Sequence, residues 1–467
     1  MEGMATNPTP EAAPTDPQLI SATYELEHHT APSLTLAAAL LGFALITLDA
    51  SVVNVALPSI GSAFGGGMSG LQWVVDAYTL AFAALMLSTG AFSDRAGASR
   101  AYGIGIAVFT LASAACGFAP GLPVLIGARV AQGVAAAVVL PASLALVRQA
   151  YPDAARRARA VALWAAGGSV AVALGPVAGG ALTTAWDWRG IFFINLPLGA
   201  LALVLLLRAP RSERRPAPLD LPGQLTAVVA LTALTFAVIE GGAGGLIALA
   251  VAVTAAVLFV RIEARQPYPV VPLGLFRSRT VSVAVAAGAA CSVAFYGVVF
   301  LFSLFFQQAQ GRSALSAGLM FLPMTGLIAV TNIAAGKLSG RYGARLPMLL
   351  GQSLAAAGLL VLLFVDASTP PVLVAVLLVP MALGCALTIP PLTAAMMDAV
   401  PADRAGLAAG VLNSARQVAG GLAIAAFGSL VSGGFGSGLR VSLALAAALL
   451  ALTATATLRL RGSAAVS

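Results

Sequence analysis

Long apolar stretches fill most of this chain and restrict it to folds that lie in a membrane. A helix needs roughly 20 apolar residues to cross a bilayer. That rule gives about fourteen spans, separated by short loops rich in Arg, Gly and Pro. With 59% hydrophobic and 9% charged residues, the composition excludes an ordinary soluble protein. The expected starts of the spans are Leu34, Leu71, Ala101, Leu122, Val161, Ile191, Leu221, Leu246, Val281, Ala317, Leu346, Val372, Gly406 and Val441.

The basic residues indicate how these spans are oriented. If the N-terminus is cytoplasmic, only Arg189, Arg312 and Arg440 of the 25 Lys and Arg residues fall in outer loops. Arg129 and Arg416 fall within the membrane, and the other 20 lie on the cytoplasmic side. This asymmetry follows the positive-inside rule and predicts that both termini are cytoplasmic. The net charge of +8 therefore reflects topology and does not indicate nucleic-acid binding.

Neither metal nor disulfide chemistry is indicated. Cys116, Cys291 and Cys385 fall in apolar spans, where we expect them to be small core residues. His28 and His29 adjoin each other in a proline-containing segment, where solvation is expected rather than metal binding. Residues 1–32 are predicted to be a disordered cytoplasmic tail without a removable signal peptide.

Two similar loops indicate an internal duplication. GAFSDRAGASR, residues 90–100, follows the second span, and GKLSGRYGAR, residues 336–345, follows the tenth. We therefore expect an N-terminal six-helix bundle over residues 33–208 and a C-terminal six-helix bundle over residues 280–467. Residues 209–279 would hold linkers and two inserted transmembrane helices, because charge and proline flank that segment.

Three charged residues are expected inside the membrane in the first bundle. At 1.5 Å per residue, Asp49 lies about 13 Å from the outer end of its span, Asp76 about 8 Å and Arg129 about 10 Å. An unpaired charge at such depth costs at least a few kcal/mol, so all three are functional candidates. They could form one polar cluster relieved by pairing or protonation. The alternatives are a static salt bridge between Asp49 and Arg129 and simple hydration of Asp76.

A glycine-rich stretch is expected to bend or seal the fifth span. In GGSVAVALGPVAGG, residues 167–180, Gly175 and Gly179 are one turn apart and Pro176 removes a backbone donor between them. Small residues at this spacing allow close helix approach, and the proline favours a bend. Ordinary packing is the alternative, but the density of glycine favours a hinge or seal.

With these motifs the chain resembles the major facilitator superfamily, and within it the fourteen-helix drug:proton antiporter family. In the loop motif, Gly90, Asp94, Arg95 and Gly97 match the superfamily, whereas residues 98 and 99 (Ala and Ser) stand where basic residues are usual. The other matching segments are LDASVVNVALP (48–58), RVAQG (129–133), the glycine-rich stretch, WDWRGIFFINLPLG (186–199), FFQQAQGRSALSAGLMFLP (305–323) and VLNSARQVAGG (411–421).

The resemblance implies an all-helical fold of two six-helix bundles plus two inserted helices, working by alternating access. Protons moving in would drive a small molecule out across the inner (plasma) membrane. Asp49 would be the proton-linked acid, Arg129 the residue that tunes it, and Asp76 a second proton-binding or cation-recognising acid. The loop motif with Asp94, and the glycine motif of the fifth span, would control the conformational change.

We expect the substrate to be a lipophilic, cationic or antibiotic-like small molecule. The candidate cavity residues are Asp76, Gln132, Asn413, Arg416 and Gln417. The resemblance implies no enzyme activity, no metal and no cofactor apart from the proton as coupling ion, and a monomer in lipid without a nucleic-acid partner.

Three other functions are alternatives to proton-coupled export. The main alternative is a proton-linked importer or facilitator of a specific metabolite in the same fold, and a membrane sensor or scaffold comes after it. A nucleotide-driven pump is excluded because Lys337 lacks both the first glycine and the Ser or Thr of a P-loop.

Overall fold

A computed structural model describes residues 32–209, 212, 214, 220–267, 269–401 and 405–460. The predicted tail therefore lies outside the described residues, apart from Pro32. Within the described residues every regular element is a helix. The predicted all-helical class is confirmed for this part of the chain.

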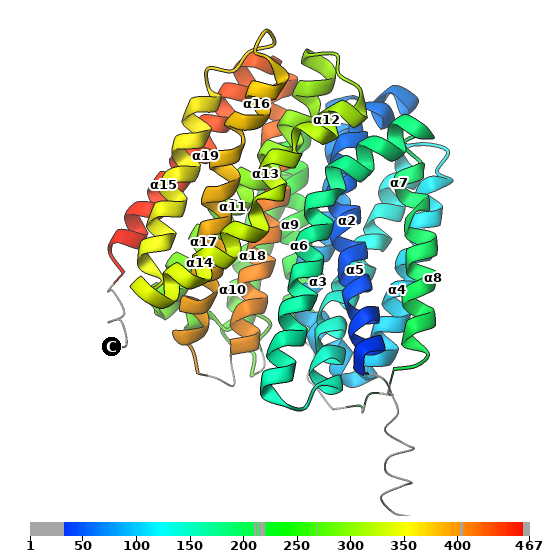
Figure 1. The fold of residues 1–467 in the computed structure, drawn as a ribbon, viewed down its shortest axis with the longest axis vertical. Coiled ribbons are helices and arrows are strands. Elements are labelled where there is room, and N and C mark those ends of the chain that lie inside the picture. The colour runs from blue at the N-terminus through cyan, green and yellow to red at the C-terminus, as the bar shows by residue number, and fades with distance from the viewer. Residues whose placement is uncertain are drawn as a thin grey trace, which may run out of the picture.

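The helices run along the long axis of the molecule (Figure 1). In chain order they are α2 (Pro32–Phe64), α3 (Gly67–Ala96), α4 (Ala98–Gly117), α5 (Leu122–Ala150), α6 (Ala154–Ala185), α7 (Gly190–Phe193), α8 (Asn195–Leu206), α9 (Leu221–Glu240), α10 (Gly242–Glu263), η1 (Leu273–Arg277), α11 (Arg279–Leu304), η2 (Phe305–Ala309), α12 (Ala314–Met320), α13 (Leu322–Gly326), α14 (Ile328–Tyr342), α15 (Arg345–Leu362), α16 (Pro371–Leu377), α17 (Val379–Asp398), α18 (Ala405–Ser432) and α19 (Phe435–Leu458).

Eleven helical segments of the described residues are long and apolar enough to cross a membrane, and the bent helix α3 raises the number to twelve. The short apolar helix Gly190–Leu206 and α18 are not among them. The fold is therefore that of a polytopic membrane protein with eleven to twelve candidate spans. The predicted number of fourteen is not confirmed by length and composition.

The two ends of the molecule are named here after a glycine at a helix connection. The Gly65 face is the end where α2 meets α3, at residues 64–67, and the Gly97 face is the opposite end, where α3 meets α4. Arg345, the first residue of α15, donates a hydrogen bond to the carbonyl of Leu458, the last residue of α19. The last helix therefore ends where α15 begins.

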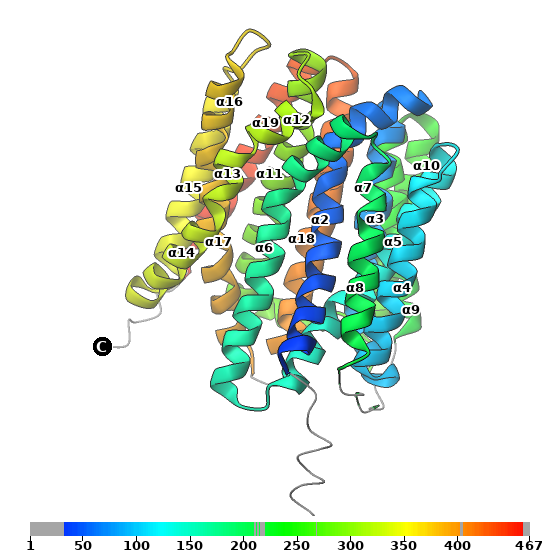
Figure 2. The same cartoon turned by 45° about the vertical axis from the view of Figure 1, so that its right-hand side comes forward.

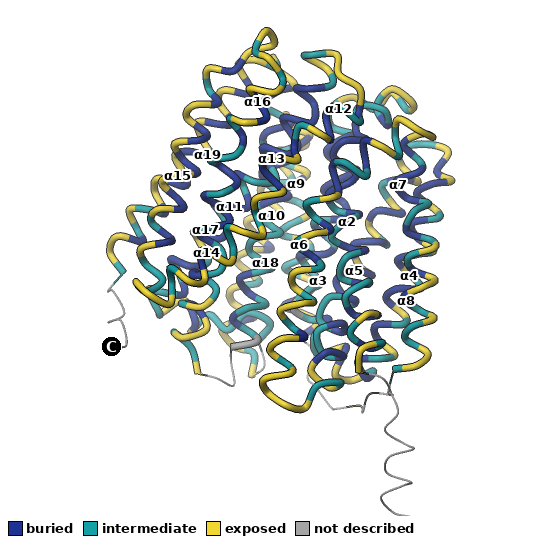
Figure 3. Tube along the Cα trace, viewed as in Figure 1, coloured by how far each residue is buried: buried dark blue, intermediate teal, exposed yellow. Residues whose placement is uncertain are grey.

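Helices from the two ends of the chain form two groups that meet along α2, α3, α6, α11, α12 and α18 (Figure 2). We call α2–α8 the first bundle and α11–α19 the second bundle. Helices α9 and α10 pack against each other, and α9 also contacts α3 of the first bundle and α18 of the second. The yellow exposed residues in Figure 3 lie mainly on the outward sides and at the ends, whereas the dark blue buried residues line the helix contacts.

Helix α3 bends by 66° between Met86 and Ser88, and a side chain of α9 contacts α3 at this bend. Gln224 donates its amide N–H to the carbonyl of Ala84 and accepts a hydrogen bond from the Ser88 hydroxyl. That carbonyl is the regular helical partner of the Ser88 N–H. A side chain that enters the ladder of backbone hydrogen bonds is a known cause of sharp helix kinks. The inserted helices therefore help to shape the first bundle.

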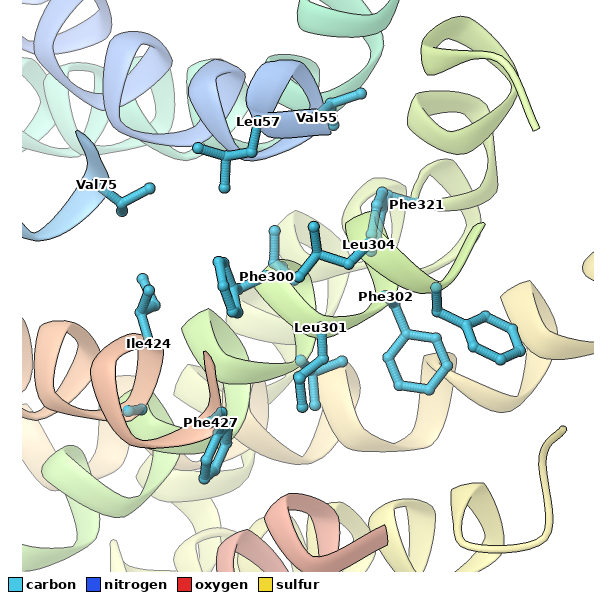
Figure 4. Packing of buried hydrophobic residues seen from close by; sticks show 14 of the residues in the cluster. Val55, Leu57, Val75, Phe300, Leu301, Phe302, Leu304, Phe321, Ile424 and Phe427 are labelled. Atoms are coloured by element: carbon cyan, nitrogen blue, oxygen red, sulfur yellow. The ribbon is translucent and has the colours of Figure 1, made fainter. Parts of the chain in front are cut away.

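The two bundles are sealed together near the Gly65 face. Val55 and Leu57 of α2 and Val75 of α3 belong to the same buried apolar cluster as Phe300 of α11 and Ile424 of α18. Figure 4 shows these side chains converging from the two bundles. Hydrogen bonds reinforce the contact. Gln307 Nε2 donates to the Val55 carbonyl at 2.9 Å, Leu315 N donates to Thr184 Oγ1 at 3.2 Å, and Gln72 Nε2 donates to the Ala425 carbonyl.

Gly180 allows α6 to approach the second bundle at this seal, so its replacement should open the Gly65 face. A Cβ atom on Gly180 would collide with the Ala314 carbonyl and lie 2.8 Å from Leu315 Cα, which are backbone atoms that cannot move aside. We expect Gly180→Ala to lengthen the distance between spin labels on Ser62→Cys and Ser368→Cys, measured by double electron–electron resonance. Gly336→Ala is the matched control because a Cβ there meets nothing within 4 Å. Identical distance distributions in all three proteins would show that Gly180 does not maintain the seal.

Candidate functional site

A buried ion pair joins α2 to α5 inside the first bundle. Arg129 Nη1 contacts Asp49 Oδ2, and both side chains are 0% exposed. Arg129 also donates from Nε to the Val74 carbonyl of α3 at 3.0 Å, and its guanidinium lies 4.4 Å from the centre of the Tyr78 ring. The arginine therefore links three helices. The interaction predicted between Asp49 and Arg129 is present in this conformation.

The second oxygen of Asp49 is fully used as well. Asn195 of α8 donates to Oδ1 at 2.7 Å, and Gln132 of α5 donates to the same atom at 3.2 Å. Asn195 also donates to Ser113 Oγ of α4 at 2.9 Å. Asn195 was not among the site residues predicted from the sequence, where one amide in an apolar span is a weak signal. Both carboxylate oxygens of Asp49 are therefore occupied by donors from α5 and α8.

Gln132 belongs to this internal network rather than to a cavity. Its Oε1 accepts from Arg129 Nη1 at 3.0 Å and from Cys116 Sγ at 3.2 Å, and its side chain is buried. The sequence predicted a substrate-cavity residue here. Its position beside Arg129 instead makes it a second donor to Asp49.

Asp76 lies apart from this network, so the three charges do not form the single cluster considered from the sequence. Its side chain is 0% exposed, and neither oxygen has a hydrogen-bond partner among the described residues. It lies beside Gly421 of α18, where an added Cβ would be 3.5 Å from Asp76 Oδ1. Asp76 follows Val74 by two residues, or roughly 200° around a helix of 3.6 residues per turn. It therefore points away from Arg129 and toward the second bundle.

A small cavity separates the bundles beside Asp76. The first bundle contributes Ala50, Asn54, Val75, Tyr78 and Thr79, and the second contributes Tyr296, Gln417, Gly420 and Ile424. Its lining is apolar and aromatic with a few amide and hydroxyl groups. Its volume is only about 20 Å³, so an organic molecule would fit there only after the bundles move apart.

The cavity candidates from the second bundle lie on one face of α18. Asn413, Arg416 and Gln417 occupy positions i, i+3 and i+4, which are neighbours on a helix surface. Gln417 lines the cavity, and Arg416 Nη1 lies 3.4 Å from Asn413 Oδ1. Among the described residues, Arg416 forms no ion pair. The structure thus groups these three candidates close to Asp76 without connecting them to Asp49.

The loop motif lies at the Gly97 face, beyond the bend in α3. Asp94 and Arg95 are exposed and form no ion pair within the described part of the chain. Gly97 has a φ of +86°, which favours glycine at this turn, whereas a Cβ on Gly90 would meet nothing within 4 Å. The motif is therefore formed as a turn, but its charges do not join the two bundles in this conformation.

The glycine motif of the fifth predicted span divides between two contacts. Gly175 and Gly179 of α6 face Ser51 and Val52 of α2, so they allow close packing within the first bundle. The carbonyl of Pro176 instead faces Gly318 of α12, across the junction between bundles. The junction is made by Pro176, together with Gly180, rather than by the two glycines selected from the sequence.

The fold and this site define a membrane protein with a buried charge network in one bundle and a small, mainly apolar cavity between two bundles. A model of the Major Facilitator Superfamily matches residues 39–424. The chain belongs to that superfamily, and its members are transporters rather than enzymes.

Similar proteins include the multidrug resistance protein Stp of Mycobacterium tuberculosis (strain CDC 1551 / Oshkosh). It is 41% identical over 410 residues, covering 85% of this chain and 76% of that protein. The methylenomycin A resistance protein of Streptomyces coelicolor is 39% identical over 394 residues, covering 83% of each. Among solved structures, a bacterial homologue of the human lysosomal transporter Spinster aligns with a TM-score of 0.64 at 16% identity, covering 91% of this chain and 96% of that one, and shows the same fold.

Breaking the internal ion pair should destabilise the protein strongly. Arg129→Gln leaves the buried Asp49 without its countercharge, which costs about 3–5 kcal/mol of unfolding free energy. Chemical unfolding in detergent would measure this loss, and Arg312→Gln, an exposed arginine, is the control for charge removal. Adding Asp49→Asn to Arg129→Gln should restore part of the stability because it removes the orphaned charge. Equal stability of Arg129→Gln and Arg312→Gln would show that the ion pair does not hold the bundle together.

Proposed function

We propose that this protein is a proton-coupled exporter of drug-like or antibiotic-like small molecules in the inner (plasma) membrane. Membership of the superfamily supports a transporter, and relatives of 39–41% identity carry the names of multidrug and antibiotic resistance proteins. The observation that carries the coupling is Asp76, a buried acid without partners that faces the second bundle beside the cavity. An acid at a moving interface is where a bound proton can alter the balance between conformations.

In this proposal Asp76, rather than Asp49, carries the proton. Asp49 has a donor on each oxygen, so a proton would have to displace Arg129, Gln132 or Asn195. Asp76 has no donor to displace within the described part of the chain, and burial of an ionised carboxylate without a partner costs several kcal/mol. Proton binding therefore relieves the cost of packing Asp76 against Gly421. The Asp49–Arg129 network would keep the first bundle rigid while the bundles move against each other.

We propose further that the Gly65 face is the outer face and that this conformation is open toward the cytoplasm. The apolar seal and several hydrogen bonds between the bundles lie near the Gly65 face, whereas Asp94 and Arg95 at the Gly97 face form no ion pair with any residue that the structure describes. Closing the Gly97 face would engage the loop motif and open the seal. Asp76 would then meet the outer solution and could accept a proton there.

Fourteen membrane crossings belong to the same proposal. They would comprise the eleven segments of sufficient length and hydropathy, the bent α3, the short pair α7–α8 and α18. The resulting division is a first bundle over residues 33–208, linkers and two inserted helices over 209–279, and a second bundle over 280–467. An even number of crossings would place both termini on the same side, and the distribution of Lys and Arg makes the cytoplasm the proposed side.

Neutralising Asp76 should abolish coupling while preserving substrate exchange. Asp76→Asn mimics the protonated acid, so we expect proteoliposomes to exchange substrate down its own gradient near the wild-type rate. Uphill transport driven by an imposed pH gradient should fall at least tenfold, because the variant cannot release and rebind a proton. Asp366→Asn is the control, because Asp366 lies in an exposed turn between α15 and α16. Gradient-driven transport at the wild-type rate in Asp76→Asn would rule out this role.

Reporter fusions test the orientation and the number of crossings. Alkaline phosphatase, which folds only outside the cytoplasm, should be inactive when fused after Ser467 and active when inserted after Ala367, next to α15. Green fluorescent protein at Ser467 should fluoresce, since that reporter folds in the cytoplasm. Strong phosphatase activity at Ser467 would require an odd number of crossings and refute the arrangement.

A further inference from the structure

Arg416 is a charged side chain at mid-depth of the second bundle that the transport proposal leaves without a partner. It lies 11 residues from the start of α18, about 16 Å along the helix axis. Its Nε is buried without a hydrogen-bond partner, and its one side-chain partner among the described residues is Asn413 at 3.4 Å. The stem of Arg416 packs beside Gly288 of α11, where an added Cβ would lie 3.3 Å from Arg416 Cγ.

The available acids do not neutralise this arginine. Asp49 is bound to Arg129, and Asp76 contacts Gly421, five residues farther along α18 than Arg416. Among the described residues, α18 takes part in no ion pair. The guanidinium cannot lose its proton in a protein, whereas an acid such as Asp76 can be neutralised by gaining one. With Asp76 protonated, the cavity region keeps a net positive charge.

A second unsatisfied polar group faces the same cavity from the first bundle. Asn54 of α2 is 3% exposed and its Oδ1 has no hydrogen-bond partner, while its Nδ2 donates to the carbonyls of Ala50 and Ser51. Buried amide oxygens normally accept a hydrogen bond. Opposite it, Gln417 supplies an amide and Tyr296 an aromatic ring. Arg416 does not line this small cavity but directly precedes Gln417, which does. A molecule that entered as the bundles move apart would meet apolar walls and an open acceptor, with the cation of Arg416 next to them.

From this arrangement we infer that the cavity binds the acidic group of an amphipathic organic anion, with Arg416 as the residue that holds it. The inference rests on the proposed transport function and assigns it a substrate class. A carboxylate or enolate would pair with Arg416, and a hydroxyl or N–H group of the same molecule would donate to Asn54. The apolar body would lie against Tyr296, Val75 and Ile424. Of the lipophilic, cationic or antibiotic-like molecules expected from the sequence, this class excludes the cationic ones.

The test uses three probes that share an apolar body and differ in charge. Pyrenebutyrate is the anion, its methyl ester is neutral and pyrenebutylamine is the cation. Fluorescence titration of the full-length protein in lipid nanodiscs, corrected with empty nanodiscs, gives each affinity. We expect wild type and Arg312→Gln to bind the carboxylate at least about tenfold more tightly than the ester or the amine, since a charged hydrogen bond in a buried site is worth that much.

Arg416→Gln should lower the affinity for the carboxylate about tenfold and change that for the ester less than twofold. Arg416→Lys keeps the charge and should retain part of the preference. The inference is overturned if wild type shows no saturable binding of the carboxylate, if it binds the amine as tightly, or if Arg416→Gln leaves carboxylate binding unchanged. Stability gives a second readout: without an acid partner to lose, Arg416→Gln should unfold at the same denaturant concentration as Arg312→Gln. A clear loss would make Arg416 structural.

Proteoliposome transport separates this inference from the transport proposal. If the carboxylate is moved but a pH gradient does not drive it, the proton coupling fails while the anion site stands. If a pH gradient drives the amine and Arg416→Gln has no effect, the anion site fails while the proton coupling stands.

Discussion

The pairing of Asp49 with Arg129 is the interaction on which the first bundle depends. A membrane interior offers neither charge any water, so each must find its partner within the protein. Asp49 on α2 takes donors from α5 and α8, and Arg129 reaches on to the Val74 carbonyl of α3. Loss of one member would strand the other. Because separating the pair is costly, it holds four helices together as one unit that can move as a body.

The bundles meet through a different kind of contact. The seal near the Gly65 face consists of apolar side chains of one buried cluster, such as Val55 and Phe300, and of close backbone approaches at Gly180 and Gly318. Apolar contacts carry no directional bonds to break, so they can open at lower cost than a buried ion pair. The unsatisfied charged groups, Asp76 and Arg416, lie in or beside this region. The rigid network and the movable surface are therefore separate parts of the molecule, and the proposed transport chemistry belongs to the second.

Sequence patterns predicted the helices well because hydropathy directly reports burial in lipid. The predicted starts at Leu122 and Leu221 coincide with those of α5 and α9. Helix α6 begins at Ala154, earlier than the predicted Val161, because Asp153 caps an arginine-rich turn that hydropathy counts as a loop. The number of crossings was harder to predict, since the short α7–α8 and the bent α3 do not satisfy a simple length rule.

The site was predictable only in part, because depth along a helix does not determine direction around it. Asp49, Arg129 and Asp76 lie at similar predicted depths, yet Asp76 points to α18 and the other two point inward. The same limitation led to the prediction of a cavity position for Gln132, whose side chain lies in the network around Arg129. Asn195 was missed because an uncharged amide stands out little in an apolar span. Side-chain direction depends on which helices become neighbours, and one sequence does not specify those contacts.

The protonation state of the two acids tests the central claim most directly. Infrared difference spectroscopy of the protein in lipid at neutral pH distinguishes the carbonyl band of a protonated carboxylic acid from the bands of a carboxylate. If Asp76 carries the proton and Asp49 stays ionised, the protonated band should disappear in Asp76→Asn and persist in Asp49→Asn. A protonated band that survives in Asp76→Asn and is lost in Asp49→Asn would contradict the account and return the coupling role to Asp49.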